Sequence, residues 1–331
     1  MDAEGRGERK RSPAPVAGPA TGSQPRPAGA SEPGSATGSQ PGPATGGGGE
    51  RDFTVMGIVN VTPDSFSDGG RYVDSEAAIA HGLELEAQGA AILDVGGEST
   101  RPGAMPVSEE EERARVVPVI EGLRAAGARA RISIDTSKAS VAEAAIAAGA
   151  TIVNDVTALR GDPRMAAVVA ASGADCCLMH MLGEPRTMQR DPRYREVVAD
   201  VAEFLVERLQ HAVACGIEER RVMLDPGIGF GKTDAHNLQL LARLRELAEI
   251  GPPLVIGTSR KSFLGRITGR EVGDRLAATI ATNVLAYERG ARIFRVHDVL
   301  PVHDALTIAA ATVLAPWQST TQTTSTTTRT R

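Results

Sequence analysis

Eight short apolar runs recur along the chain, and each has the length of a β-strand. They are rich in Val, Ile and Leu and lack strict alternation of apolar and polar residues. Strands of a parallel sheet have this sequence pattern when both faces of the sheet are covered. In chain order the runs are VMGIVN, AAILDVGG, ARISIDT, ATIVND, CCLMH, RVMLDPG, PLVIGTSR and RIFRVHD.

A longer segment with helical periodicity follows each run. Eight strand–helix units in succession predict an α/β fold, the (β/α)8 TIM barrel. The expected helices span residues 75–88, 108–126, 138–148, 164–171, 197–214, 237–249, 274–289 and 301–314. Because the carboxyl ends of all strands open onto one face of such a barrel, the polar residues that end the runs should surround one mouth. These residues are Asn60, Asp94, Asp135, Asn154, His180, Asp225, Arg260 and His297.

The two ends of the chain differ in composition from the barrel. Residues 1–50 are dominated by Gly, Pro, Ala, Ser and Thr, and residues 316–331 are mostly Thr, Ser and Gln. Neither segment can bury enough apolar surface to offset the entropy lost on ordering. We therefore expect a disordered leader and a disordered tail around a single folded domain at residues 51–315.

The overall charge and the absence of long apolar segments exclude several classes of protein. A net charge of −5 and a pI near 5.8 argue against a nucleic-acid partner, whose binding domain would normally be basic. No apolar stretch approaches the roughly 20 residues that span a bilayer, so no membrane partner is expected. The first residues lack the apolar region of a secretory signal. Three cysteines without a disulfide pattern fit a cytoplasmic protein.

Basic residues near the last strands predict an anion site. Arg295 and His297 are two positions apart on one strand, so their side chains share a face. An arginine suits bidentate contact with phosphate, and the last strands of a TIM barrel are the usual phosphate-binding region. Arg101, Arg260 and Lys261 add positive charge nearby. The alternative is that Arg295 pairs with a structural acid.

Three strand-end residues predict a site for a nitrogen-rich ring. Asp135, Asn154 and Asp225 would each be a buried polar group in need of a partner. Two carboxylates and an amide suit a guanine-like or pterin-like heterocycle better than a sugar. Lys261 is placed to bond a ring carbonyl or nitrogen, and Phe230 in DPGIGFGK to stack on a flat ring.

Three of the connections that follow strands are long: VTPDSFSDGGRYVD, GGESTRPGAMPVS and MLGEPRTMQRDPRYRE. Long loops on the active face of a barrel are candidate lids. Asn60 stands just before the first of them and offers a neutral oxygen, which suits a Mg²⁺ ion bridging phosphate oxygens. Mg²⁺ is therefore the expected cofactor.

Seven segments carry a resemblance to a known family. MGIVNVTPDSFSDGG, DVGGESTRPGA, SIDTSK, IVNDV, DPGIGFGK, GTSRKSFLG and FRVHDV occur in this order between residues 55 and 299. Together they closely resemble the dihydropteroate synthase family. That family joins (7,8-dihydropterin-6-yl)methyl diphosphate to 4-aminobenzoate and releases 7,8-dihydropteroate and diphosphate. The resemblance implies these small-molecule substrates and a homodimer formed by the outer helices near the last two strand–helix units.

The resemblance also assigns a role to each motif residue. The pterin would be held by Asp135, Asn154, Met179, Asp225, Phe230 and Lys261. The diphosphate would be held by Asn60, Arg101, Arg295 and His297, with Asn60 as the Mg²⁺ ligand. The aminobenzoate pocket would be shaped by Phe66, Thr100, Pro102 and Ser262. The residues with catalytic roles would be Asp68, Asp135, Lys261, Arg295 and His297. Among them, Asp68 would stabilise developing positive charge or assist amine deprotonation.

Two other functions share part of this pattern. A barrel that transfers a methyl group from methyltetrahydrofolate to a corrinoid would need the pterin carboxylates and amide. It would need neither the diphosphate residues nor the loop GGESTRPGA. A paralogue that binds pterin without turnover would need no complete set of loops.

Overall fold

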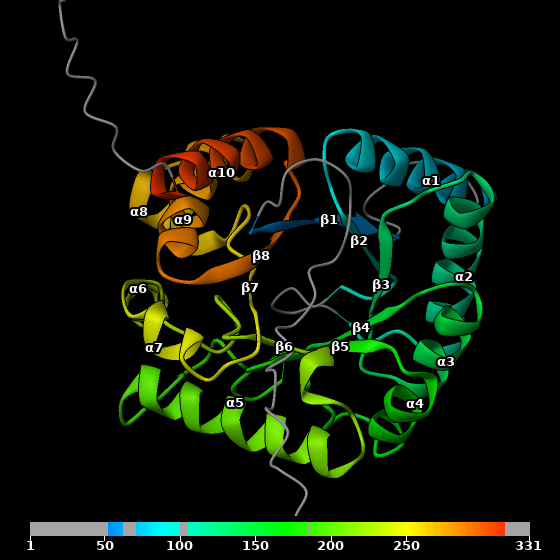
Figure 1. Cartoon of the computed structure of the whole chain (residues 1–331), viewed down its shortest axis with the longest axis horizontal. Helices are drawn as coiled ribbons and strands as arrows, with labels where there is room; N and C mark the ends of the chain where they lie inside the picture. The colour runs from blue at the N-terminus through cyan, green and yellow to red at the C-terminus, as the bar shows by residue number, and fades with distance from the viewer. Residues whose placement is uncertain (1–51, 62–70, 100–104, 185, 315–331) are drawn as a thin grey trace, which may run out of the picture. The chain divides into compact units, whose positions relative to one another are not determined.

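Eight parallel strands close into a barrel in the part of the chain that the computed structural model describes, which is residues 52–61, 71–99, 105–184 and 186–314 (Figure 1). The strands follow chain order around the barrel, and β8 pairs with β1. Their bounds are β1 Thr54–Asn60, β2 Ile92–Gly96, β3 Arg131–Asp135, β4 Ile152–Asp155, β5 Asp175–Met179, β6 Val222–Asp225, β7 Leu254–Ile256 and β8 Ala291–Val296. The predicted leader, the predicted tail and the central residues of the first two long loops lie outside the described residues.

Helices alternate with the strands and surround the barrel, so the predicted (β/α)8 fold is confirmed. Their bounds are α1 Arg71–Ala87, α2 Glu109–Ala125, α3 Ala139–Ala147, α4 Met165–Ser172, α5 Val197–Ala214, α6 Asp234–Ala242, α7 Leu244–Ala248, α8 Ser262–Thr268, α9 Leu276–Glu288 and α10 Val299–Leu314. The start of α2 follows its sequence closely. Ser108 caps it by accepting a hydrogen bond from the Glu111 N–H, and acidic residues fill the positively polarised first turn.

Two helices differ from the sequence prediction. The segment 237–249 was predicted as one helix, but it forms the end of α6 and a separate α7, broken at Arg243, whose φ of −110° and ψ of 24° are not helical. The short helix α8 was not predicted. Its seven residues include Gly265 and are too few to show an apolar period.

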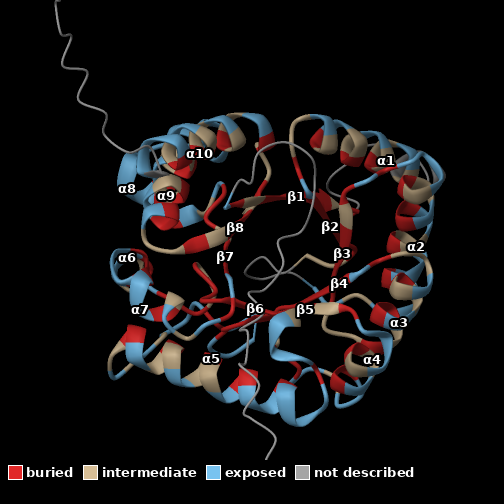
Figure 2. Ribbon diagram, viewed as in Figure 1, coloured by how far each residue is buried: buried red, intermediate tan, exposed pale blue. Residues whose placement is uncertain are grey.

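Two apolar layers hold the barrel. The larger lies between the strands and the inner faces of the helices, where buried residues line the strands (Figure 2). The smaller lies among the strands and contains Met56, Ile92, Ile152, Cys177, Met223, Val255 and Ile293. In β2, β4, β6 and β8 this apolar residue comes two positions before a polar one, so both side chains point to the same side of the sheet. The apolar residues thus form a floor beneath the polar residues of the mouth.

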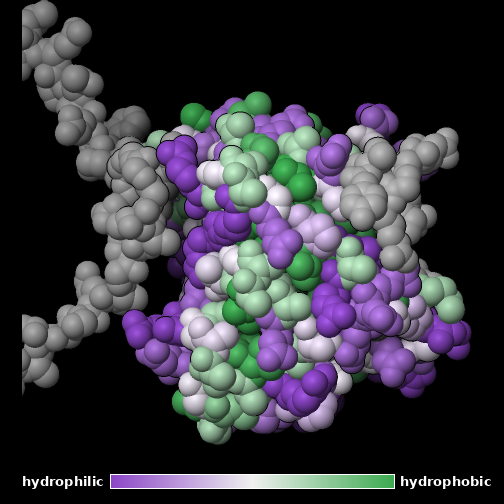
Figure 3. All heavy atoms as spheres, turned by 90° about the vertical axis from the view of Figure 1, so that its right-hand side faces the viewer, coloured by the Kyte–Doolittle hydropathy of each residue, from purple (hydrophilic) through white to green (hydrophobic). Residues whose placement is uncertain are grey.

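The outer surface mixes residue types. On the face formed by α1 to α3, hydrophilic and hydrophobic residues are interspersed (Figure 3). Within the described ranges, none of the helices combines the length and the apolar character needed to cross a membrane.

Candidate active site at the barrel mouth

The polar strand-end residues meet at the carboxyl side of the barrel, as the sequence predicts. Asp135 ends β3, Asn154 lies in β4, Asp225 ends β6 and Arg295 lies in β8. Arg295 reaches across the mouth, and its Nη2 donates to Asp135 Oδ2 at 2.7 Å. Asn60 is the last residue of β1 and is half-buried. The strand geometry alone brings these groups together.

A further carboxylate joins two of these residues. Asp94 in β2 is fully buried, and its Oδ2 accepts from Arg295 Nε at 2.6 Å and from Asn154 Nδ2 at 3.1 Å. Arg295 therefore does pair with acids, which was the alternative interpretation, but one of them, Asp135, lines the cavity at the mouth and the other, Asp94, is buried beside it. Burial alone would lower the pKa of the guanidinium, and the two carboxylates outweigh it, so the pKa of Arg295 is raised.

The Asp135 carboxyl has an unusual acidity. Burial raises its pKa to about 7, and the negative charges of Asp94, Glu112 and Asp155 add to this effect. The Arg295 guanidinium opposes it. A carboxyl that titrates near neutral pH in a concave site is typical of functional groups.

Asp225 is fixed by the turn that follows it. Its Oδ1 accepts from the Gly227 N–H at 2.7 Å. Gly227 has a φ of +66°, and a Cβ there would lie 1.9 Å from the carbonyl oxygen of His180, so only glycine fits. Burial raises the pKa of Asp225, while the Gly227 N–H and the Lys261 ammonium lower it.

One wall of the site is apolar. Met179, at the end of β5, packs with Val156, Met181 and Met188, and Phe230 packs against this cluster. Lys261 Nζ lies 4.1 Å from the centre of the Phe230 ring, a cation–π contact. A flat apolar wall beside buried polar groups suits a heteroaromatic ring. The Phe230 ring that was predicted to stack on the substrate also positions Lys261.

The loops after β7 and β8 hold each other. Ser259 Oγ lies 3.0 Å from His297 Nδ1 and accepts from the His297 N–H at 3.1 Å. Arg260 has a φ of +56°, which is rare for a residue with a side chain, and its Nε and Nη2 both donate to the Asp298 carboxylate. These contacts fix His297 relative to the chain just before Lys261. Ser262 begins α8 and is exposed.

Lys232 is a polar residue near the site that the sequence reasoning missed. It is 1% exposed, and its Nζ lies 2.9 Å from His180 Nδ1 and 3.0 Å from the Phe230 carbonyl oxygen. Burial lowers the pKa of Lys232 to about 7. Burial, together with the Lys232 charge, lowers the pKa of His180 to about 2. The signal in the sequence was a charged residue that ends the glycine-rich run DPGIGFGK.

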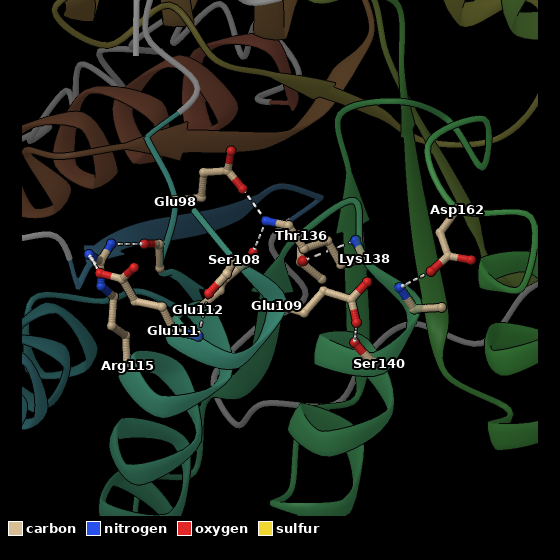
Figure 4. A network of polar contacts seen from close by, with 12 residues as sticks. Glu98, Ser108, Glu109, Glu111, Glu112, Arg115, Thr136, Lys138, Ser140 and Asp162 are labelled. Carbon is tan, nitrogen blue, oxygen red and sulfur yellow. Dashed lines mark hydrogen bonds and ion pairs between the residues drawn. The ribbon is translucent and has the colours of Figure 1, made fainter. Parts of the chain in front are cut away.

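The stem of the second long loop is tied to its neighbours (Figure 4). Lys138 Nζ contacts the carboxylates of Glu98 and Glu112, and Arg115 donates to the Gly97 carbonyl oxygen at 2.7 Å. The stem is therefore held by α2 and by the β3–α3 turn. Five predicted site residues lie outside the described residues: Phe66, Asp68, Thr100, Arg101 and Pro102. Their roles stay predictions.

A cavity of about 180 Å³ opens beside Asp135. It lies between the loops that follow β2, β3, β4 and β5, and Glu98, Thr136, Val156 and Met181 contribute to its walls. The mouth of the barrel is thus hollow next to Asp135, the carboxylate whose pKa is raised to about 7.

Comparison with known proteins gives consistent matches over the barrel. A family model described as pterin binding enzyme matches residues 56–297. The dihydropteroate synthase of Escherichia coli (strain K12) is 45% identical over 261 residues, which is 79% of this chain and 92% of the relative. The solved structure of Xanthomonas albilineans dihydropteroate synthase with 4-aminobenzoic acid has a TM-score of 0.75 and 52% identity, and the match covers 80% of this chain and 94% of that one. The same enzyme in complex with 7,8-dihydropteroate gives a TM-score of 0.72 and 49% identity over the same shares.

Proposed function

Because the chain belongs to the family of pterin binding enzymes and has the dihydropteroate synthase activity of folate biosynthesis, we propose that the polar mouth of its barrel carries out the whole reaction. The reaction joins (7,8-dihydropterin-6-yl)methyl diphosphate to 4-aminobenzoate and releases 7,8-dihydropteroate and diphosphate. The observation that carries the proposal is the Arg295 guanidinium, held by two buried carboxylates at the mouth. The methyltransferase and the non-catalytic alternatives lose their basis, since the relatives that match most of the chain are dihydropteroate synthases.

The pterin ring binds at the polar edge and the apolar wall. Asp225 and Asn154 accept from the ring amine and the ring N–H, and Lys261 donates to the ring carbonyl or nitrogen. Met179 and Phe230 cover a ring face, which their shared cluster supports. Arg295 and His297 hold the diphosphate, and a charge-assisted contact of this kind contributes about 1.5–3 kcal/mol.

The bond changes follow from this placement. The C–O bond to the diphosphate breaks first and leaves a cation on the exocyclic methylene carbon, which the electron-rich dihydropterin delocalises. The ionised Asp135 carboxylate stabilises that charge, because electrostatic effects are strongest in a site that excludes water. The amine nitrogen of 4-aminobenzoate then forms the C–N bond and loses a proton, for which Asp68 is the proposed acceptor. Ser262 is the proposed contact for the aminobenzoate among the described residues, and the roles of Phe66, Thr100 and Pro102 in this pocket stay predictions.

Mg²⁺ fits the donor set of this mouth. Within the described ranges, no cluster of three or more His, Cys, Asp or Glu side chains could hold a metal by itself. Mg²⁺ commonly binds through one or two protein oxygens while the substrate phosphates and waters supply the rest. Asn60 at the end of β1 offers such an oxygen. When bound, the ion would neutralise charge on the departing diphosphate.

The pH dependence of product formation tests the role given to Asp135. The carboxylate must be ionised to stabilise the cation, and burial raises its pKa to about 7, so the active form is lost as the pH falls. We expect kcat/KM for the dihydropterin diphosphate to fall about tenfold per pH unit below pH 7. Dihydropteroate formation, measured from pH 5.5 to 8.5 with saturating Mg²⁺ and 4-aminobenzoate, gives the profile.

Asp135→Asn is the matched variant for this profile. The terminal phosphate of the substrate also titrates in this range. Only the part of the fall in kcat/KM at low pH that disappears in the variant can therefore be assigned to Asp135. Lys232 also has a pKa of about 7. As the pH falls, Lys232 gains a positive charge, whereas Asp135 loses its negative charge. An unchanged fall in rate at low pH in Asp135→Asn would show that another group controls it.

Chelation of Mg²⁺ should stop turnover and leave binding of a bare pterin intact.

We also propose that the enzyme is a homodimer through α8 to α10. Among the described residues, seven of the eleven exposed large apolar side chains lie between residues 262 and 314, namely Ile267, Val272, Leu276, Leu285, Leu300, Ile308 and Val313. Such a concentration favours a protein interface. Ile308→Lys should shift the sedimentation coefficient to that of a monomer, whereas Val213→Lys on α5 should not. Unchanged sedimentation of both variants would reject this face.

A further inference from the structure

We infer that Asp94 is a positioning residue that sets the donor and acceptor pattern of the pterin pocket without touching the substrate. The inference rests on the proposed pterin site. It goes further, because it predicts which atoms of that site face the ligand. Its basis is the single oxygen Oδ2 of Asp94, which accepts from both Arg295 Nε and Asn154 Nδ2.

The first consequence concerns the amide of Asn154. An ionised carboxylate can only accept hydrogen bonds, so the amide must turn its NH₂ group toward Asp94. The carbonyl Oδ1 of Asn154 then faces away from Asp94. Without this contact the amide could rotate by half a turn and offer a donor in place of an acceptor. Asp94 therefore makes Asn154 an acceptor for the ligand.

The second consequence concerns Arg295 and Asp135. With Nε bound to Asp94, the planar guanidinium presents Nη2 to Asp135 Oδ2. Nε and Nη2 are used by the two carboxylates, so the inference assigns Nη1 to the anion. Asp135 Oδ1 is the oxygen that Arg295 leaves for the ligand. A lysine in this position could not hold two partners in this fixed geometry.

A purely structural role does not explain Asp94, because a buried carboxylate at this position lowers the stability of the fold. Its side chain is fully buried, and Oδ1 has no hydrogen-bond partner among the described residues. The Oγ of Ser133, its register partner in β3, is also buried without such a partner. An unsatisfied buried acceptor lowers stability. A carboxylate at this position is therefore better explained by its effect on Asn154 and Arg295.

These hydrogen bonds leave three acceptor oxygens of the site unused, namely Asn154 Oδ1, Asp135 Oδ1 and Asp225 Oδ2. The inference assigns them to a ligand edge that carries N–H groups. A pterin has such an edge in its ring N–H and its 2-amino group. A 2,4-dioxopteridine has a carbonyl in place of the amino group, and two acceptors would then face each other.

Asp94→Asn tests this inference through ligand preference. An asparagine at position 94 can donate as well as accept, so the Asn154 amide is free to take either orientation. Calorimetry should show that the wild-type protein prefers a bare pterin over the 2,4-dioxopteridine by on the order of a hundredfold. In Asp94→Asn we expect that preference to fall by about tenfold. The KM for the dihydropterin diphosphate should rise at the same time.

Asp175→Asn is the control. Asp175 pairs with Arg131 at 2.6 Å between β5 and β3, but at the opposite end of the strands. Its loss should lower the melting temperature and leave the ligand preference unchanged. If Asp94→Asn keeps the wild-type preference while Asp225→Asn loses pterin binding, the inference about Asp94 is wrong and the pterin site stands. If Asp225→Asn also binds pterin normally, the pterin site itself is wrong.

A measurement on the wild-type protein covers the case in which Asp94→Asn does not fold. One of the two side-chain NH₂ protons of Asn154 should be protected from solvent exchange in the ligand-free enzyme, because it already bonds Asp94. Adding pterin should leave that protection unchanged, since the ligand binds the other atom of the amide. Fast exchange without ligand and protection only with pterin would overturn the inference.

Discussion

Arg295→Ala is expected to cause the largest loss of both activity and stability of any single substitution at the mouth. The variant leaves Asp94 and Asp135 as buried carboxylates without their cation, and breaking a buried pair in this way costs about 3–5 kcal/mol. It also removes the donor that faces the diphosphate, so kcat/KM should fall on the order of a thousandfold. Chemical denaturation and steady-state kinetics measure the two effects.

Arg266→Ala is the matched control for this variant. Arg266 donates to Asp234 from Nε and Nη2, but the pair lies on the surface, with 56% and 36% of the two side chains exposed. Removal of an exposed pair should cost about 1 kcal/mol or less. Arg295→Lys should recover part of the stability but little activity, because an ammonium cannot hold both acids in a plane. Equal destabilisation by Arg295→Ala and Arg266→Ala would contradict the idea that Arg295 stabilises the buried carboxylates of Asp94 and Asp135.

Asp225→Asn should be the most damaging substitution for pterin binding. A carboxylate can accept from Gly227 N–H and from two donors of the ligand, whereas an amide must turn either its NH₂ group or its oxygen toward the ring. If the oxygen keeps the Gly227 bond, the NH₂ group faces a ligand donor. We expect the dissociation constant of a bare pterin to rise on the order of a hundredfold, or about 3 kcal/mol. Isothermal titration calorimetry measures it.

Asp155→Asn provides the comparison. Asp155 is also a fully buried strand-end aspartate, but its oxygens accept from Thr157 and from the Leu159 N–H, within the β4–α4 turn. The variant should lose stability and keep its pterin affinity within about threefold. Similar losses of affinity in both variants would mean that Asp225 acts through the fold and not through contact with the ring.

Much of the fold could be predicted from the sequence because its signals are local. The eight apolar runs coincide with the eight strands, and the helix predicted from residue 108 begins at the Ser108 cap. The predictions were less accurate where the local pattern was weak. The break at Arg243 has no proline or glycine to mark it, and the seven residues of α8 are fewer than the window of roughly 11 residues in which a helical period can be recognised.

The residues that meet at the mouth of the barrel could be predicted for a similar reason. In a parallel barrel the carboxyl end of each strand has only one possible location, so Asp135, Asn154 and Asp225 had to meet once the strands were assigned. The partners of these residues could not be predicted. Asp94 was one of eight polar strand-end residues, and nothing in the sequence distinguished it from the others. Lys232 lies in a glycine-rich loop, where a charged side chain is usually exposed.

The sequence by itself determined the barrel, the identity of the residues at its mouth and, through the co-linear motifs, the reaction. The tertiary structure decided how those residues are paired: which carboxylates hold Arg295, which way the Asn154 amide faces, and why the pKa of Asp135 lies near 7. The physical reason is the separation along the chain of the residues that interact. Strand and helix patterns arise from neighbours along the chain, whereas the Asp94–Arg295 contact joins residues 201 positions apart and depends on burial that only the closed barrel creates.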